Sequence, residues 1–566
     1  MKRLLLVTAV VLGGCGTDVS GPPSSLYSCV FREAPPLAVG EVLTVSGAGH
    51  RSVCLTAGDS SAVFAYIPFS AVAPVEGTPP EVRLAMEVLG AGLPAGAISS
   101  EPGVGPASPG IPASPDAAVE RSSPVRLGND LHGWLREREK RELTPKIRAG
   151  GAPDPWAAAP AAGELPEPGD LRELNVALSC TDTDMRTGRV MWVSERAIIL
   201  EDTARPTGLT AHDHEHFAVT FDTLVYPVAT RHFGTPTDID GNDRIMVFFT
   251  GSVNERNPRG SASMTTGLFW TGDLFPAVAT ARLDACPASN HAEIFYLAIP
   301  DPHGALGPPV GVNWIRDQAV RVMAHEYQHL LNAARRLYIN DADRFEQTWL
   351  NEGLSHVAEE LVFLQAAGLA PGSNIGSATL AGSARVYRAF GLYMSGNFEN
   401  LGRYLARAPE ESLTGKDGLA TRGATWSFLR YAADRSGAGD EWVFFRLLNS
   451  RTAGLDNLNQ VLAAPAQSWI HDWAVALYAD DHVDGVDPVY TQPSWNFRDL
   501  YARAWGSYPL SPTVLRPGSS GSVSLQPGGA GFLVFGVEGR GAAALHVEAD
   551  AATPPRSLQG SFLRIR

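Results

Sequence analysis

Val322-Met-Ala-His325-Glu326-Tyr-Gln-His329-Leu330-Leu331 is the stretch around which this chain of 566 residues is organised. Its apolar flanks predict a helix, and helical residues four apart lie on one face about one turn apart. His325 and His329 can therefore direct their imidazoles to one point, with Glu326 beside it. This arrangement binds zinc through two histidines and places a carboxylate against water at the metal.

A third ligand is expected downstream, in Thr348-Trp-Leu-Asn-Glu352-Gly-Leu-Ser-His356. The interval after His329 is long enough to end one helix, turn, and return a second helix antiparallel to the first. The rival pattern H-E-x-x-H-x-x-G-x-x-H is excluded, because the chain has Asn332 and Arg335 where that pattern needs glycine and histidine. Glu352 is then the third ligand, and one zinc position stays open, as a catalytic site requires.

His356 follows Glu352 by one helical turn and lies on the same face. It could orient a ligand, bind substrate or only pack, since groups that hydrogen-bond to ligands commonly orient them. If Glu352 does not bind the metal, His356 is the next residue on that face able to reach it.

The motif and the segment Trp349-Leu-Asn-Glu-Gly-Leu-Ser355 resemble the gluzincin zinc metallopeptidases, and most closely the hyicolysin-type family. The resemblance is carried by these two segments, and it does not extend outside roughly residues 171–480. It implies a zinc-dependent endopeptidase with His325, His329 and Glu352 as metal ligands and Glu326 as the catalytic general base. It also implies a downstream Tyr or His that stabilises the transition state. Four residues stay open for that role: Tyr393, Tyr404 and Tyr431, and Arg422, which is of neither type.

The composition is that of a globular protein of several domains, with 44% apolar and 19% charged residues. The formal charge of −15 argues against nucleic acid as a partner and says little about the substrate. Protein or peptide substrates are expected from the metallopeptidase resemblance. The sequence leaves the oligomeric state, the cleavage specificity and the natural substrate open.

Residues 1–14 are predicted to be a signal peptide, with a basic start and an apolar run too short to span a bilayer. Leu12-Gly-Gly-Cys15 resembles the lipobox of bacterial lipoproteins, which implies lipidation at Cys15 and attachment to the cell envelope. Plain secretion is the alternative. The lipid anchor is the sole membrane contact expected.

The expected fold class is α+β, because a strand-rich region precedes the predicted metal-binding helices. Residues 15–100 are expected to form a tether and a β-rich domain, and residues 101–170 a Pro/Ala-rich linker with an exposed charged helix. The metallopeptidase domain, a mixed sheet followed by a mainly helical part, is assigned to residues 171–508. A second β-rich domain follows over residues 509–566. Residues 16–170 are predicted to be dispensable for folding of the rest.

Three further patterns carry predictions. Export permits disulfides, and the four cysteines after Cys15 allow three pairings. Cys29–Cys54 is favoured because both residues lie in one small β-rich region, and Cys180–Cys286 would follow. Asp238-Ile-Asp-Gly-Asn242 departs from the EF-hand pattern, so it is favoured as a tight turn, with an irregular calcium site as the alternative. The three alternate histidines that start at His212 are favoured as a helix start over a metal site.

Two other functions compete with an enzyme. One is a surface-anchored binding lipoprotein whose peptidase-like domain is inactive, and the other is a structural lipoprotein without metal. Zinc content after dialysis separates the metal-free protein from the enzyme, and peptidase activity separates the inactive binder.

Overall fold

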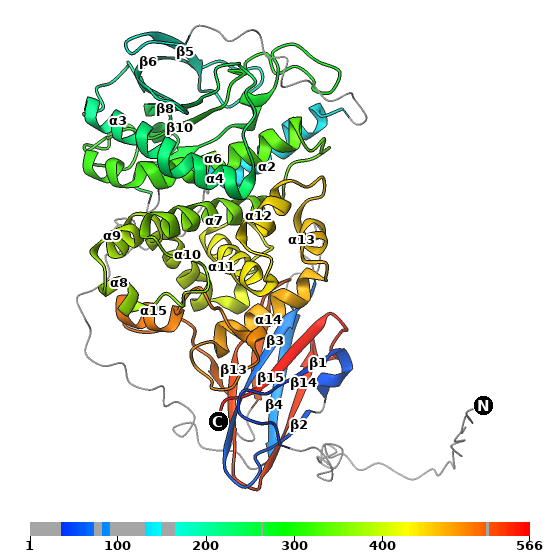
Figure 1. The fold of residues 1–566 in the computed structure, drawn as a ribbon. Helices are drawn as coiled ribbons and strands as arrows, with labels where there is room; N and C mark the ends of the chain where they lie inside the picture. Colours follow the sequence, from blue (N-terminus) through cyan, green and yellow to red (C-terminus); the bar gives the residue numbers. More distant parts are fainter. Residues whose placement is uncertain are drawn as a thin grey trace.

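The computed structural model describes residues 36–51, 53–72, 82–90, 131–148, 165–261, 264–516 and 520–566. A mixed sheet, a layer of helices and a β-sandwich follow one another along the length of the molecule (Figure 1). The α+β fold class is therefore confirmed. Within the described residues, no helix combines the length and the apolar character needed to cross a membrane.

The mixed sheet has six strands in the order β5-β6-β7-β8-β10-β9. Strands β7, β8 and β10 pair in parallel and the other neighbours are antiparallel. The central strands are apolar runs such as Ile-Met-Val-Phe-Phe, as expected for strands covered on both faces. The bounds are β5 Leu171–Asn175, β6 Met185–Val193, β7 Ala197–Asp202, β8 Ile245–Phe249, β9 Gly267–Leu268 and β10 Ile294–Leu297.

One helical segment packs beside this sheet, consisting of α3 (Ala211–Thr220), a π-helical turn and α4 (Tyr226–Phe233). Phe217 of α3 stacks on Phe249 of β8 with ring centroids 5.3 Å apart. The π-helical turn (Phe221–Val225) joins α3 to α4, and Pro227 lies in the first turn of α4.

The helical layer is built on α6 (Val312–Tyr338), α7 (Thr348–Ala367) and α11 (Leu419–Ser436). Glycine lets α7 and α11 approach closely, because a Cβ on Gly353 would lie 2.3 Å from Thr425 Cγ2. The remaining helices are α5 Gly251–Glu255, α8 Ser377–Ala381, α9 Ala384–Tyr393, α10 Ser395–Ala406, α12 Asp440–Leu448, α13 Gly454–Leu462, α14 Ala466–Ala479 and α15 Phe497–Trp505.

The β-sandwich is made from both ends of the chain. Its two sheets have the orders β1-β15-β3-β13-β11 and β12-β4-β14-β2. N-terminal and C-terminal strands therefore alternate, except that the C-terminal strands β13 and β11 are neighbours. The expectation of two separate β-rich domains is therefore wrong. The bounds are β1 Val42–Ser46, β2 Val53–Thr56, β3 Ala62–Ser70, β4 Val82–Gly90, β11 Thr513–Val514, β12 Ser520–Leu525, β13 Leu533–Val537, β14 Ala542–Ala549 and β15 Leu558–Arg564.

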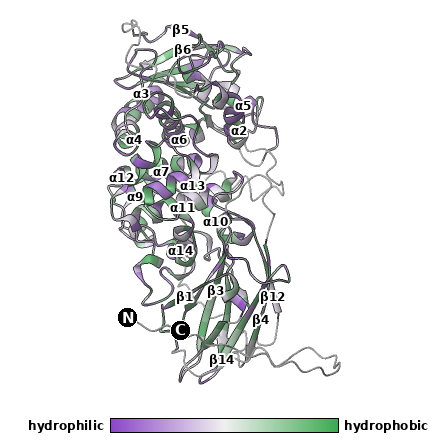
Figure 2. Ribbon diagram, turned by 90° about the vertical axis from the view of Figure 1, so that its right-hand side faces the viewer, coloured by the Kyte–Doolittle hydropathy of each residue, from purple (hydrophilic) through white to green (hydrophobic). Residues whose placement is uncertain are grey.

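Strand β3 joins the sandwich to the helical layer. All nine of its residues are buried, and it pairs with β13 on one side and β15 on the other. Hydrophobic colouring follows the sandwich strands in Figure 2. On the face toward the helices, the ring of Phe69 stacks on His471 of α14 at 5.5 Å. Residues 16–170 supply the central strand of a shared core, so the structure argues against the prediction that they are dispensable for folding.

A disulfide joins Cys180 and Cys286, as predicted, with an S–S distance of 2.07 Å. It links the segment after β5 to the segment before β10. Cys54 is also disulfide-bonded, while Cys29, its expected partner, lies outside the described residues.

Removing the N-terminal strands should prevent correct folding. A chain beginning at residue 165 leaves β13 and β15 without their shared neighbour and exposes their apolar faces. We expect this chain to be insoluble or aggregated in size-exclusion chromatography, with the full-length protein soluble. A soluble truncated chain with a cooperative thermal transition would contradict the shared core.

A buried ion pair fixes the turn between α6 and α7. Glu346 pairs with Arg336 and also accepts hydrogen bonds from Gly454 N at 2.6 Å and Asn457 Nδ2 at 2.9 Å. Glu346→Ala should lower the free energy of unfolding by roughly 3–5 kcal/mol, since it leaves the Arg336 charge buried and unpaired. Denaturant unfolding measures this. Glu410→Ala, which removes an exposed pair with Arg407, is the control, with an expected change below about 1 kcal/mol. Equal effects would refute the role of Glu346.

Candidate metal centre

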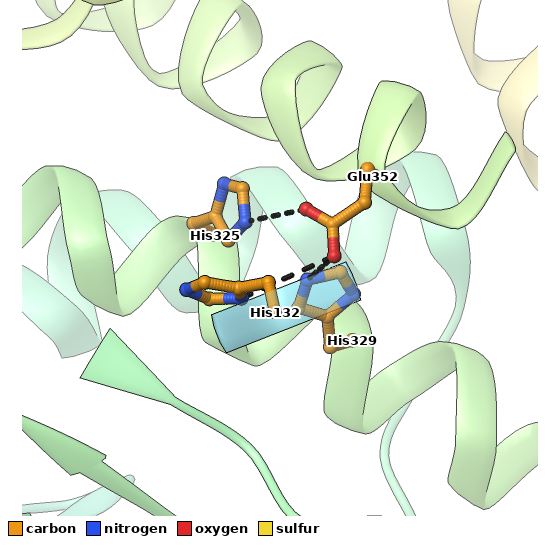
Figure 3. Close-up of side chains that lie close together, drawn as sticks. All are labelled: His132, His325, His329 and Glu352. Carbon is orange, nitrogen blue, oxygen red and sulfur yellow. Dashed lines mark ion pairs between the residues drawn. The ribbon is translucent and has the colours of Figure 1, made fainter. Parts of the chain in front are cut away.

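Helices α6 and α7 bring three of the predicted site residues together. His325 and His329 lie one turn apart on α6 with ring centroids 4.9 Å apart, and Glu352 faces them from α7 (Figure 3). The carboxylate lies between the rings: Oε2 is 3.4 Å from His325 Nε2, and Oε1 is 3.4 Å from His329 Nε2.

These separations fit ligands of one metal better than hydrogen-bonded partners. An N–H···O hydrogen bond spans about 2.7–3.2 Å. Zinc–nitrogen distances of about 2.0–2.1 Å in a tetrahedron place neighbouring donor atoms about 3.3–3.4 Å apart. Both Glu352 oxygens are fully buried and accept no hydrogen bond from the described residues. A buried carboxylate whose oxygens accept no hydrogen bond is suited to binding a cation.

The charges at the site favour the same conclusion. Burial alone would raise the pKa of Glu352, but Arg422 and the two histidines hold it well below its usual range, so Glu352 is a carboxylate. Burial lowers the pKa of His329 to about 4, so this ring is neutral. Burial also opposes charge on His325, but Glu352 and Glu359 outweigh it and raise its pKa to about 10. Without a metal, a protonated His325 supplies the cation that these carboxylates need.

Glu359 orients His325 and was not found by sequence reasoning. Its Oε1 lies 2.8 Å from His325 Nδ1, which leaves Nε2 of that ring facing Glu352. Burial alone would raise the pKa of Glu359, but His356 and Arg321 hold it well below its usual range. A carboxylate on the outer nitrogen is the usual partner of a metal-bound histidine. The available signal was spacing, because Glu359 follows Glu352 by seven residues, two turns along one face.

His356 lies beside this pair and not in the group around Glu352. Its Nδ1 is 2.8 Å from Asn397 Oδ1 and 3.4 Å from Glu359 Oε1, and its ring centroid is 5.0 Å from that of His325. The structure therefore places it next to the orienting carboxylate Glu359.

Glu326 lies beside the group without joining it. It is buried, and burial raises the pKa of its carboxyl to about 7. Strand β9 crosses over it closely: a Cβ on Gly267 would lie 2.2 Å from Val322 Cγ1 and 3.1 Å from Glu326 Cγ. The carboxyl thus stands between helix α6 and the edge strand of the sheet.

Arg422 is the one residue of the four left open for transition-state stabilisation that lies at this site. Its Nη1 is 3.4 Å from Glu352 Oε2, and Asp417 holds the guanidinium with contacts of 2.9 and 2.6 Å. The tyrosines face other surroundings: Tyr431 donates to Val489 O, and Tyr404 packs on Trp473. Tyr393 is among residues of a separate small pocket on the α3 side.

His132 completes a group of four and was missed entirely. It is the second residue of helix α2 (Leu131–Leu143), which was expected to be an exposed helix in a linker. Instead, one ring nitrogen each of His132, His325 and His329 and one oxygen of Glu352 lie within 4.8 Å of one another (Figure 3). Nothing in its sequence spacing relates His132 to the motif, since the contact is made by tertiary structure alone.

The site opens into a cleft of about 1930 Å³. Small-molecule pockets usually hold about 300–1,000 Å³, so this cleft is large enough for a polymer chain. The residues that line the cleft come from the edge strand β9 and the residue before it, and from helices α6, α7, α11 and α2. They include Thr266, Gly267, His325, Glu326, Trp349, Arg422, His132 and Trp134.

The other predicted sites have different outcomes. Asp213, between His212 and His214, forms a capping box with Thr210 at the start of α3, and His214 contacts Glu201 at 2.7 Å, so the helix-start interpretation is confirmed. Asp238, Asp240 and Glu293 gather closely enough to hold a cation, so calcium stays a prediction. Cys15 lies outside the described residues.

Comparison with known proteins gives a partial match. No family model matches the chain. A stretch of 201 residues is 27% identical to the neutral metalloprotease ShpI of Staphylococcus hyicus. The match covers 34% of this chain and 41% of that relative, so the chain spans less than half of its length. This similarity supports a metalloprotease relationship and, with the buried histidines and glutamates, suggests a metal ion.

The role of Glu359 can be tested through metal affinity. Glu359→Gln keeps the shape but removes the charge that orients His325, so affinity for the metal should fall about 10–100-fold. Competition with a chromogenic chelator measures this. Glu410→Gln, an exposed position, is the matched control. Unchanged affinity in Glu359→Gln would show that the carboxylate does not act on the site.

Proposed function

We propose that this protein is a zinc-dependent endopeptidase of the gluzincin type, related to the hyicolysin-type family, that hydrolyses peptide bonds in proteins. The observation that carries the proposal is the buried set of His325, His329 and Glu352, with 3.4 Å between each histidine and the carboxylate. Two imidazoles and one carboxylate are the protein ligands of hydrolytic zinc sites with one open position. Zinc bound there would polarise a peptide carbonyl and lower the pKa of water at the open position.

Glu326 is assigned the role of general base. It is adjacent in sequence to His325, is absent from the ligand group and faces the cleft. With a pKa near 7, its carboxyl can accept a proton from water and return it to the leaving amine at neutral pH. Burial is the cause of that pKa, so the base depends on the closed surroundings of α6 and β9.

Arg422 is assigned to the developing negative charge of the transition state. Its guanidinium is always protonated, lines the cleft and is fixed by Asp417. A fixed donor aimed at developing charge in a water-poor site stabilises the transition state more than the ground state.

The cleft suits an extended peptide. Strand β9 is an edge strand, and Thr265, Thr266 and Gly267 line the cleft beside Glu326. An extended segment can add to such an edge through main-chain hydrogen bonds, which places its peptide bonds along the site largely independently of sequence. This favours a protein substrate.

The proposal includes export. The signal-like start and Leu12-Gly-Gly-Cys15 support a lipoprotein attached at Cys15 to the bacterial cell envelope, acting on proteins at the surface or outside the cell. An inactive peptidase-like binder remains the alternative, and loss of activity on substituting Glu326 decides between the two.

Substitutions at the two glutamates should separate catalysis from metal binding. Glu326→Gln should keep about one zinc per chain while activity falls roughly 10²–10⁴-fold, since it removes the base alone. Glu352→Ala should lose zinc and activity together, as should His325→Ala and His329→Ala. Zinc content after dialysis and casein hydrolysis, with and without a chelator, measure both quantities.

Glu410→Gln, an exposed position, should match the unmodified protein in both measurements. The proposal fails if Glu326→Gln retains full activity, or if Glu352→Ala retains both zinc and activity. Loss of zinc from Glu326→Gln would move that residue into the ligand set.

A further inference from the structure

His132 stands where the open position of the site would be. Its Nδ1 lies 4.0 Å from Glu352 Oε1, and its Nε2 lies 4.0 Å from Glu326 Oε1. Its ring centroid is 5.7 Å from that of His325 and 6.3 Å from that of His329. The imidazole therefore lies between the ligand carboxylate and the proposed base, in the space where a water must lie for Glu326 to deprotonate it.

Helix α2 is held at this place by polar contacts made by buried side chains. Arg136 donates to Phe269 O, and Glu139 accepts from Thr271 N at 2.7 Å and pairs with Arg136 at 2.7 Å. Phe269 directly follows strand β9, and Thr271 comes two residues later. The helix thus binds backbone groups at the end of the strand along which a peptide substrate is proposed to lie.

The buried face of α2 is unusual for a helix that only packs. Its five buried residues are His132, Leu135, Arg136, Glu139 and Leu143, of which three are polar or charged. Helices that contribute only to a core bury an apolar stripe. Burying charged groups is unfavourable unless each is matched, so this face is complementary to the cleft and not to a generic apolar surface.

The helix also comes close to the wall that carries Arg422. A Cβ on Gly133 would lie 2.7 Å from Asp417 Oδ2, the carboxylate that holds Arg422. Beyond α2, the chain continues along the protein, with Ile147 paired to Leu283 and Arg148 N donating to Arg282 O at 2.8 Å. The segment 131–148 therefore lies against the base, the ligands, the carboxylate that holds Arg422 and the end of the edge strand.

We propose that segment 131–148 is an inhibitor built into the chain, and that His132 is a fourth protein ligand of the metal. The inference rests on the proposed zinc peptidase. With His132 in place, three imidazoles and one carboxylate fill a tetrahedral site, which is the closed coordination of a structural centre. The full-length chain is then largely latent, and its remaining activity comes from the molecules in which the segment has left the cleft.

X-ray absorption at the zinc edge tests the ligand count in full-length protein. The unmodified chain should show three imidazoles and one carboxylate, and His132→Gln should show two imidazoles with an added water oxygen. His132→Cys should restore a closed site, with a sulfur scatterer near about 2.3 Å. His132→Ala checks that glutamine itself is not a ligand. His212→Ala, at a side chain 88% exposed, is the control and should keep three imidazoles.

Activity on a short fluorogenic peptide gives a second readout. His132→Gln should hydrolyse it roughly tenfold faster or more than the unmodified chain, because a larger fraction of molecules has an open site. His132→Cys should stay as slow as the unmodified chain.

The outcomes separate this inference from the proposed function. If neither the unmodified chain nor any variant retains zinc, the proposed function fails, and the inference fails with it. If the unmodified chain retains zinc with two imidazoles and is as active as His132→Gln, the peptidase stands and the inhibitor is rejected. Unchanged coordination in His132→Gln also overturns the inference.

Discussion

The structure depends on the burial of carboxylates beside imidazoles where α6 meets α7. Glu352 and Glu359 are almost inaccessible to solvent, as is His329. An unpaired buried charge is strongly unfavourable, so the interior must hold matching positive charge at this place. In the metal-free chain, His325 with its raised pKa and Arg422 supply it. A divalent cation among the donor atoms would do so directly and would let His325 be neutral.

The surrounding fold holds these side chains in position. The turn between the two helices is fixed by Glu346 and Arg336, and Gly353 lets α11 bring Arg422 against the ligand carboxylate. On the other side, Gly267 lets the edge strand lie directly over Glu326. The close contacts explain why glycines stand inside an otherwise regular helix and strand, where they lower intrinsic stability. Packing of α7, α11 and β9 thus determines where the ligand and base side chains lie.

Sequence reasoning succeeded where the relevant geometry is local. His325 and His329 share a helical face by spacing alone, and Glu352 follows within one helical hairpin, so the spacing of the three residues is enough to group them. The strands of the mixed sheet were predictable too, because apolar runs are also a local feature of the sequence. Glu359 was predictable in the same way, because it lies two turns after Glu352 on one face of α7.

What the sequence could not reveal depends on contacts between distant segments. Nothing near His132 indicates that its helix lies in the cleft, and the charges that suggested solvent exposure include Arg136 and Glu139, which are buried in matched contacts. The sandwich was divided wrongly because strand pairing between β3 and β15 joins residues close to opposite ends of the chain. Pairing at such separation leaves no periodic signal, since each strand alternates the same way whichever partner it has.

The central claim is that the buried group binds zinc, and anomalous X-ray scattering from crystals of the full-length protein tests it most directly. Data collected on both sides of the zinc absorption edge should give one strong difference peak per chain, surrounded by His325, His329 and Glu352. Absence of that peak in zinc-supplemented crystals, or a peak that lies only at Asp238, Asp240 and Glu293, would contradict the account.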